Sequence, residues 1–339
     1  MRILVTGGAG FIGSALVRAI VARGDTAITF DAMTYAAHPR NLAGIPPERH
    51  VFIRGDIRQA GALRAALARY RPDAVMHLAA ESHVDRSISG PGDFISTNIA
   101  GTATLLGEVL HYWQEGGHDP AFRFLHVSTD EVFGSLGPEG AFAEDTPYAP
   151  NSPYSASKAA SDHLVRAWGR TYGLPVLITN CSNNYGPRQC AEKLIPRVIA
   201  HAAAGAAIPV YGDGTNCRDW LHVEDHVDAL LAVLDRATPG SRYCIGGGTE
   251  LSNIALVGRI CDHLDARRPG NAPHARLISF VADRPGHDFR YAIDSARIAR
   301  DLGWSPRRRF DVALGETVDW FLAHPDRLAP GMVDRGKAA

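Results

Sequence analysis

The sequence predicts an α/β fold: a doubly wound parallel Rossmann-type sheet with a smaller C-terminal substrate-binding lobe. Two observations predict it. Short apolar segments alternate with helical segments through the first 180 residues, and a glycine-rich turn at residues 7–13 joins the first apolar segment to the first helix. Strands that alternate with helices usually lie parallel, with the helices packed on both faces of the sheet.

The elements follow one another in a regular order. Strands are expected at residues 3–5, 27–30, 51–54, 74–78, 122–128 and 176–179, and helices at 14–22, 61–69, 94–113 and 154–172. After about Asn180 the chain becomes rich in Gly, Pro, Asn and Arg, and site-forming loops are expected at 181–187, 210–219 and 282–288. Residues 1–180 are therefore predicted to bind a dinucleotide. Residues 181–325 are predicted to be mainly a substrate-binding lobe, interleaved with the last strands of the sheet, and a frayed tail is expected from about Asp326.

Composition excludes several classes of protein. The net charge of −1 provides no basic field for nucleic acid or a membrane surface. The five cysteines form no CxxC pair, so we expect reduced thiols and neither a structural metal nor a disulfide framework. The N-terminus becomes glycine-rich too early for a signal peptide, and no apolar run approaches the roughly 20 residues of a membrane span. A cytoplasmic protein is expected.

The glycine turn predicts a dinucleotide site. Gly7, Gly10 and Gly13 form a GxxGxxG pattern between a strand and a helix, where small residues let the backbone approach a pyrophosphate. Asp31 ends the next strand, and a carboxylate there accepts from the ribose 2′-hydroxyl and repels a 2′-phosphate, which favours NAD over NADP. Asp56 ends the following strand. It either accepts from the adenine amino group or caps a helix, and the two roles are compatible.

A tyrosine and a lysine are spaced for redox chemistry. Tyr154 and Lys158 stand four positions apart, which puts them on one face of a helix. An ammonium group beside a phenol favours the phenolate and is expected to lower its pKa. A surface Tyr/Lys pair is the alternative. The cofactor motif and Thr129 favour hydride transfer at a nicotinamide ring instead.

Two adjacent carboxyl groups indicate a second reaction. Asp130 and Glu131 follow Thr129 directly after an apolar strand, so they are expected at its carboxyl end, where such sheets bind ligands. The charge on one can hold the other protonated, which separates an acid from a base. The alternative is a solvated acidic turn. Together with hydride transfer, an acid and a base predict an elimination, and Thr129 is expected to bond a substrate hydroxyl and support Tyr154.

The motifs as a set resemble the extended short-chain dehydrogenase/reductases and, more closely, the dTDP-glucose 4,6-dehydratases. The resemblance covers roughly residues 1–320 and rests on residues 6–13, 78–87, 129–134, 154–158, 183–187, 192–196, 218–221 and 283–288. The Thr129–Asp130–Glu131 triplet is what distinguishes these dehydratases from their sister epimerases.

The resemblance implies a hydro-lyase of deoxysugar biosynthesis, dTDP-rhamnose biosynthesis included. Tyr154 would take the proton of the C4 hydroxyl as a hydride passes to NAD⁺. Glu131 would then remove the C5 proton, Asp130 would protonate the departing C6 hydroxyl, and the hydride would return to C6. The product would be dTDP-4-keto-6-deoxyglucose, and NAD would stay bound through turnover.

The predicted binding residues come partly from the chemistry of the side chains and partly from the family resemblance. By their chemistry, Arg218 pairs with a diphosphate, Lys193 and Arg284 with neighbouring His287 are further candidates, and Tyr211 stacks on a pyrimidine. Each Arg alone could equally form a surface ion pair. The full prediction for the cofactor is Gly7, Gly10, Phe11, Ile12, Gly13, Asp31, Thr34, Asp56, Ile57, Leu78, Ala79, Ala80, Ser82, Thr97, Tyr154, Lys158 and Asn183. For the substrate it is Ser82, Thr129, Asn184, Lys193, Leu194, Tyr211, Arg218, Asn253, Arg284 and His287.

Three departures from the family pattern leave alternatives open. Residues 188–191 replace an aromatic residue and a Phe-Pro pair, Ala32 replaces a common lysine, and Phe133 replaces a frequent tyrosine. The first leaves the preferred base or sugar open, so a 4,6-dehydratase of a UDP-linked sugar is the main alternative. The remaining alternatives, in this order, are a sugar-nucleotide 4-epimerase and a non-catalytic NAD-binding regulator.

Assembly is predicted from two helices. The helices at 94–113 and 154–172 carry apolar residues on more than one face, which requires a second packing partner. Burial against the sheet and the lobe of the same subunit is the alternative. The resemblance implies a homodimer in which these two helices form a four-helix bundle with their copies.

Overall fold

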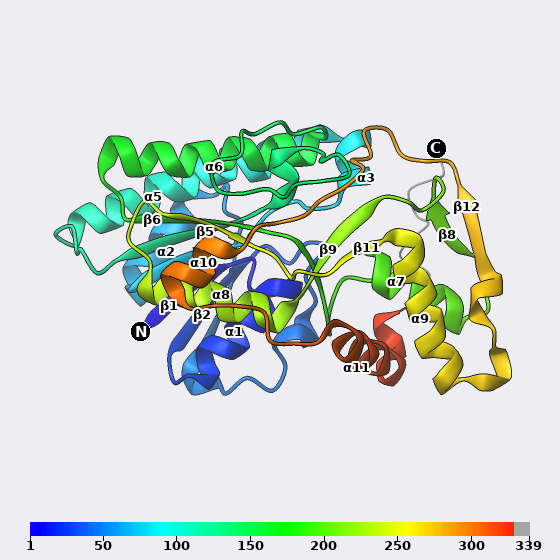
Figure 1. The fold of residues 1–339 in the computed structure, drawn as a ribbon. Helices are drawn as coiled ribbons and strands as arrows, with labels where there is room; N and C mark the ends of the chain where they lie inside the picture. Colours follow the sequence, from blue (N-terminus) through cyan, green and yellow to red (C-terminus); the bar gives the residue numbers. More distant parts are fainter. Residues whose placement is uncertain (329–339) are drawn as a thin grey trace.

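The computed structural model describes residues 1–328, and a seven-stranded parallel sheet runs through its centre (Figure 1). The strand order is β10-β6-β5-β4-β1-β2-β3. The strands are β1 (Arg2–Thr6), β2 (Thr26–Asp31), β3 (His50–Arg54), β4 (Ala74–His77), β5 (Arg123–Thr129), β6 (Val176–Cys181) and β10 (Arg242–Ile245). The predicted Rossmann-type sheet is confirmed, and β10 shows that the C-terminal half contributes an edge strand to it.

Helices cover both faces of this sheet (Figure 1). One face carries α1 (Phe11–Ala22), α8 (Val223–Arg236) and α10 (Ala296–Leu302), and the other carries α2 (Ala60–Tyr70), α5 (Thr102–Glu115) and α6 (Pro153–Tyr172). The helix expected at 94–113 is built from three consecutive segments: α4 (Pro91–Phe94), a π-helical segment (Ile95–Gly101) and α5. The short helix α3 (Val84–Ser89) precedes them.

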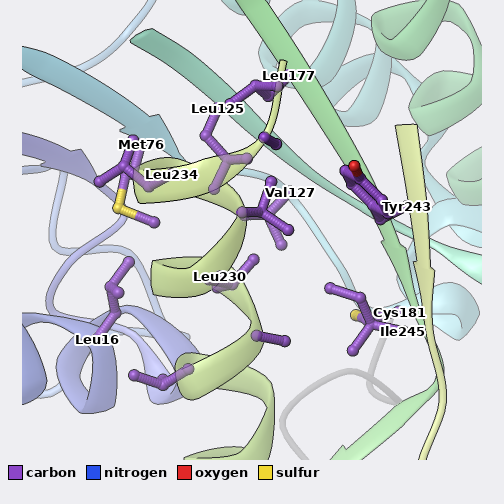
Figure 2. Close-up of a cluster of buried hydrophobic side chains, with 14 of the residues drawn as sticks. Leu16, Met76, Leu125, Val127, Leu177, Cys181, Leu230, Leu234, Tyr243 and Ile245 are labelled. Atoms are coloured by element: carbon purple, nitrogen blue, oxygen red, sulfur yellow. The ribbon is translucent and has the colours of Figure 1, made fainter. Parts of the chain in front are cut away.

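The core on the α1/α8 side shows why the strands read as continuous apolar runs. Figure 2 shows Leu16 of α1 and Leu230 of α8 among side chains of the central strands, including Met76, Leu125 and Leu177. These side chains are fully buried, and burying one leucine contributes about 1.5–3 kcal/mol. Because helices cover both faces, strand residues pointing either way meet apolar partners.

The C-terminal lobe has a core of its own around Trp220, Ile260 and Leu314. Its helices are α7 (Leu194–Ala203), α9 (Asn253–Arg267) and α11 (Phe310–Ala323). Two small sheets join them, β11-β9-β7 and β12-β8, from β7 (Asn183–Tyr185), β8 (Ile208–Tyr211), β9 (Cys217–His222), β11 (Glu250–Ser252) and β12 (Ile278–Val281). Short 3₁₀ turns lie at 39–42, 47–49, 130–133, 269–271, 274–277 and 325–327.

Two of the three expected loops are partly strands. Residues 181–187 contain β7, and residues 210–219 contain the end of β8 and the start of β9; only 282–288 is without helix or strand. The expected frayed tail falls mostly outside the described residues, since the 3₁₀ turn at 325–327 is ordered and residues 329–339 are not described. Among residues 1–328, no helix combines the length and the apolarity needed to cross a bilayer.

The sheet order fixes where a ligand can bind. The chain runs from β1 through β2 to β3 on one side, then returns to place β4, β5 and β6 on the other side of β1. Helices that leave the two halves in opposite directions open a crevice at the carboxyl ends of β1 and β4.

Candidate active site

A cavity of about 450 Å³ lies at these carboxyl ends. Its wall contains every predicted cofactor residue, from Gly7 to Asn183, and all five predicted catalytic residues: Thr129, Asp130, Glu131, Tyr154 and Lys158. The sequence motifs, which are spread over more than 150 positions, therefore meet at one site.

The glycine turn is packed so closely that side chains would not fit. Gly7 has φ of +72°, and a Cβ there would lie 2.7 Å from the backbone N of Ala79. A Cβ on Gly13 would lie 2.1 Å from the carbonyl oxygen of Gly7. No side chain caps α1, whose N-terminus faces the cavity at Phe11, so the turn and the helix end fit the pyrophosphate of a dinucleotide.

Asp31 is held at the end of β2 by two backbone N–H groups. Its Oδ2 accepts from Ala9 at 2.9 Å and its Oδ1 from Met33 at 2.7 Å. Burial raises the pKa of this carboxyl group, and the two N–H groups oppose that rise. The oxygens have further lone pairs, so the position fits a ribose hydroxyl of NAD.

Asp56 does not cap a helix. Helix α2 has Gln59 at its N-cap, and Asp56 instead pairs with Arg58 at 2.6 Å, an interaction that lowers the pKa of its carboxyl group. The capping interpretation is therefore wrong, because the chain makes one further turn before α2 begins. The cavity wall contains both Asp56 and Arg58, so the predicted cofactor role stays open.

The predicted catalytic residues are positioned by a strand end and a capped helix. Thr129 ends β5 and caps the 3₁₀ turn Asp130–Phe133, since its Oγ1 accepts from the backbone N of Glu131 at 3.3 Å. Helix α6, which carries Tyr154 and Lys158, begins with a Ser152/Ser155 capping box.

The two carboxyl groups differ in their surroundings. Burial, then the charge of Glu131, raises the pKa of Asp130 well above its usual value. Burial also raises the pKa of Glu131, but Arg284, Lys193 and Arg218 oppose this rise. Asp130 is thus the group held protonated and Glu131 the one more readily ionised, a difference that an acid and a base would need.

Tyr154 departs from expectation. Its pKa is raised well above 10, first by burial and then by the charge of Glu131, so the expected lowering by Lys158 is wrong for the protein alone. A hydrogen bond with Thr129 opposes the rise. Lys158 is itself buried, which lowers its pKa.

Only four of the predicted substrate residues line this cavity: Ser82, Thr129, Asn184 and Lys193. Lys193 Nζ donates to the carbonyl of Ser82 at 2.9 Å. The others lie outside the wall: Leu194, Tyr211, Arg218, Asn253, Arg284 and His287. Their roles remain predictions.

Arg218 is engaged by the protein itself. It is buried in β9, and its guanidinium donates to the carbonyls of Cys217 (2.7 Å), Asp288 (2.9 Å) and Phe289 (3.3 Å). The guanidinium also lies 4.2 Å from the ring centre of Tyr291. The charge of Arg218 opposes the rise that burial causes in the pKa of Glu131.

Tyr211 and Arg284 meet at one carboxylate. Tyr211 donates to Asp85 at 3.1 Å, and Arg284 lies 3.5 Å from the other oxygen of Asp85. The ring of His287 is 6.4 Å from that of Tyr211. Three predicted substrate residues from distant parts of the chain therefore do gather at one place.

Several residues at the site had not been predicted. Asn98, in the π-helical segment, donates to Ser157 Oγ (2.8 Å) of α6 and pairs with the backbone of Glu81, so it fixes the cavity wall to the catalytic helix. A π-helical segment inside a helix often marks a functional site, but nothing in residues 95–101 signals one in advance. Gln189 and Cys190, within the atypical segment 188–191, also line the cavity.

The chain is similar to known proteins over nearly its whole length. The family model described as GDP-mannose 4,6 dehydratase matches residues 4–317. A dTDP-glucose 4,6-dehydratase of Xanthomonas campestris is 54% identical over 326 residues, covering 95% of this chain and 93% of the relative. The dTDP-glucose 4,6-dehydratase 1 of Escherichia coli is 53% identical over 337 residues, with 96% and 93% covered.

Solved structures agree. DesIV, a dTDP-glucose 4,6-dehydratase from Streptomyces venezuelae with NAD bound, superposes with a TM-score of 0.89 at 45% identity, covering 97% of this chain and 99% of its own. A UDP-glucose 4-epimerase from Thermotoga maritima reaches 0.84 at only 25% identity, with 96% and 100% covered. The epimerase shares the fold, whereas the dehydratases share the sequence as well. The chain therefore belongs to the dTDP-glucose 4,6-dehydratase family.

Proposed function

We propose that this protein converts dTDP-glucose to dTDP-4-keto-6-deoxyglucose and water, with NAD retained through turnover. The observation that carries the proposal is the Asp130–Glu131 pair in one cavity with Tyr154 and Lys158. An epimerase needs no such acid and base pair, and the names of the curated relatives support the same substrate.

The glycine turn, Asp31 and the wall around Lys158 would hold NAD. When bound, NAD⁺ would supply the redox chemistry, as hydride acceptor from C4 of the sugar and hydride donor to C6. Lys158 supplies positive charge beside Tyr154, whose phenol burial would otherwise keep protonated.

The side chains would act in sequence. Tyr154 accepts the proton of the C4 hydroxyl as the ketone forms, which makes the C5 proton acidic. Glu131 removes that proton, and Asp130 gives its own to the C6 oxygen, so water leaves. Glu131 then returns its proton to C5, and C6 has lost its hydroxyl.

Thr129 lies where the proton balance must be restored. After one turnover Tyr154 holds one proton more and Asp130 one fewer. Thr129 donates to Asp130 Oδ1 at 3.2 Å, and its interaction with Tyr154 opposes the rise in the pKa of that phenol. We propose that its hydroxyl carries the proton from Tyr154 back to Asp130.

One assay tests the function. The purified protein is incubated with dTDP-glucose or UDP-glucose without added NAD, and the ultraviolet absorbance of a 4-keto product is read after base treatment. We expect a product from dTDP-glucose, whereas a 4-epimerase would give a galactosyl product from UDP-glucose. Faster turnover of UDP-glucose would overturn the choice of base, and Gln189 and Cys190 on the wall would then be the residues to exchange.

Further proposals concern organisation and setting. We propose that residues 1–180 chiefly hold the cofactor and residues 181–325 the nucleotide sugar. Five free cysteines fit a reducing, cytoplasmic setting, and the product suits deoxysugar biosynthesis such as that of dTDP-rhamnose. A homodimer through α5 and α6 is proposed as well, since Ile95 and Tyr172 leave apolar surface exposed there.

A further inference from the structure

Lys158 lines the cavity, and its ammonium group also contacts residues of the protein interior. Its side chain is 5% exposed, and Nζ donates to the carbonyl of Val127 at 2.9 Å. The ring Nε2 of His126 lies 3.5 Å from the same Nζ. Neither partner carries a negative charge, so these contacts alone do not balance a buried ammonium group.

A buried carboxylate lies one side chain further in. Asp162, one turn along α6 from Lys158, is 0% exposed, and its Oδ1 is 3.1 Å from Nε2 of His126. Its Oδ2 accepts from Tyr148 at 2.7 Å and from Asn180 at 3.1 Å. No step of the proposed reaction uses this carboxylate.

Only one cation in this cluster can balance the negative charge of Asp162. Burial, first of all, lowers the pKa of His126 to about 4, so the ring is neutral and cannot be the cation that pairs with Asp162. Burial opposes ionisation of Asp162, but the nearby His126 ring, the charge of Lys158 and the hydrogen bond from Tyr148 lower its pKa. The remaining cation is the Lys158 ammonium, and a buried charge needs such a partner.

Other titratable groups face Lys158 and do not supply that charge. They are His77 on β4, His126 on β5, Cys181 on β6 and Tyr154 on α6. Burial lowers the pKa of His77 and raises the pKa values of Cys181 and Tyr154, so all of these groups are neutral near neutral pH.

We propose that Asp162 is a positioning residue, whose negative charge, acting across His126, keeps Lys158 protonated and directed at the cavity beside Tyr154. This inference rests on the proposed function, because it takes Lys158 to be the charge that assists Tyr154. The inference gives a role in the reaction to Asp162, a residue that touches neither substrate nor cofactor.

The expected effect is a shift in the pH profile. Without the Asp162 charge the ammonium group is less stable, so Lys158 loses its proton at a lower pH and the alkaline limb of kcat moves downward. The Asp162 charge raises the pKa of Lys158, and a nearby opposite charge shifts a pKa by roughly 1–3 units, so we expect Asp162→Asn to move that limb by about one unit or more. Asp162→Glu should leave it near its native position. A structural role alone would lower the rate at every pH without moving the limb.

The test measures kcat against pH for the native holoenzyme and for both variants. The ionisation of Tyr154 is followed in parallel by ultraviolet difference titration against each protein's Tyr154→Phe counterpart. Asp225→Asn is the matched control, since Asp225 is a buried carboxylate on α8 that caps the backbone of Arg307 and Arg308. Its profile should keep the native limbs.

The outcomes separate this inference from the proposed function. An unmoved alkaline limb in Asp162→Asn overturns the inference, and Asp162→Ser, which also removes the charge, decides the matter if the Asn variant is not recovered folded. Lys158→Met tests the function itself. If Lys158→Met keeps the native rate, the proposed role of Lys158 fails, whatever Asp162 does.

Discussion

At the scale of single residues, the proposed reaction depends on the two adjacent carboxyl groups, and the proposal gives each of them a separate task. We expect Glu131→Gln to reduce dehydration by about 10²-fold or more, the usual contribution of a general base, and to abolish exchange of the C5 proton with solvent. Asp130→Asn should slow loss of the C6 hydroxyl comparably but keep C5 exchange, because the base is still present. Product formation and deuterium incorporation in heavy water measure the two steps.

Glu139→Gln serves as the control for these substitutions. Glu139 is exposed in the loop that follows Phe133, outside the cavity wall, so its variant should retain the native rate. If both active-site variants keep full water loss from C6, the assignment of acid and base is wrong.

Single residues also show what the sequence can and cannot predict. Gly7, Asp31, Tyr154 and Lys158 were predictable because strand ends and helical spacing fix their places locally. The surroundings of Arg218 were not, since its acceptor on Asp288 lies 70 positions away. The pKa of Tyr154 was misjudged for the same reason, because burial by distant segments outweighs a neighbour on the same helix.

At the scale of elements, three segments meet at the edge of the cavity. The guanidinium of Arg86 on α3 lies 3.7 Å from the ring centre of Tyr35, which follows β2, and 3.1 Å from Glu192, which precedes α7. The Tyr35 hydroxyl donates to Glu81 at 2.8 Å. Since Glu81 and Glu192 line the cavity, these contacts join the cofactor half to the lobe across its opening.

Removing that junction should loosen the cofactor. An exposed ion pair and a cation–π contact together contribute about 1 kcal/mol, so we expect Arg86→Ala to release NAD about fivefold faster. Bound NAD remaining after gel filtration at successive times measures the rate. Arg259→Ala is the matched control, because Arg259 likewise pairs with a carboxylate (Asp311) and faces a ring (Phe310), but in the lobe. Equal retention of NAD in both variants would show that these contacts do not slow the release of NAD.

The elements differ in how far the sequence could predict them. Six of the seven strands of the central sheet were placed within two residues of their bounds, because each is a buried apolar run between turn residues, whereas β10 was not predicted. In the lobe, β7 and β11 have only three residues each and owe their conformation to pairing with β9. Such pairing is decided by contacts far apart in the chain, so β7 was predicted to be part of a loop and β11 was not predicted.

At the scale of the whole molecule, the catalytic helix is also a candidate for assembly. Helices α5 and α6 pack side by side on one face of the sheet (Figure 1). Ile95, at the start of the π-helical segment that leads into α5, is 56% exposed, and Tyr172 at the end of α6 is 48% exposed. Covering them with a second copy would bury this apolar surface and would support the helix that carries Tyr154 and Lys158.

The proposed dimer predicts the outcome of a charge placed on this surface. Ile95→Glu should shift the protein from dimer to monomer at micromolar concentration, because a carboxylate would lose its water in an apolar interface. Val312→Glu is the control: Val312 is 54% exposed on α11, away from α5 and α6, and its variant should stay dimeric. Light scattering measures both masses. A native protein that is already monomeric contradicts the dimer, whereas a dimer that tolerates Ile95→Glu places its interface elsewhere.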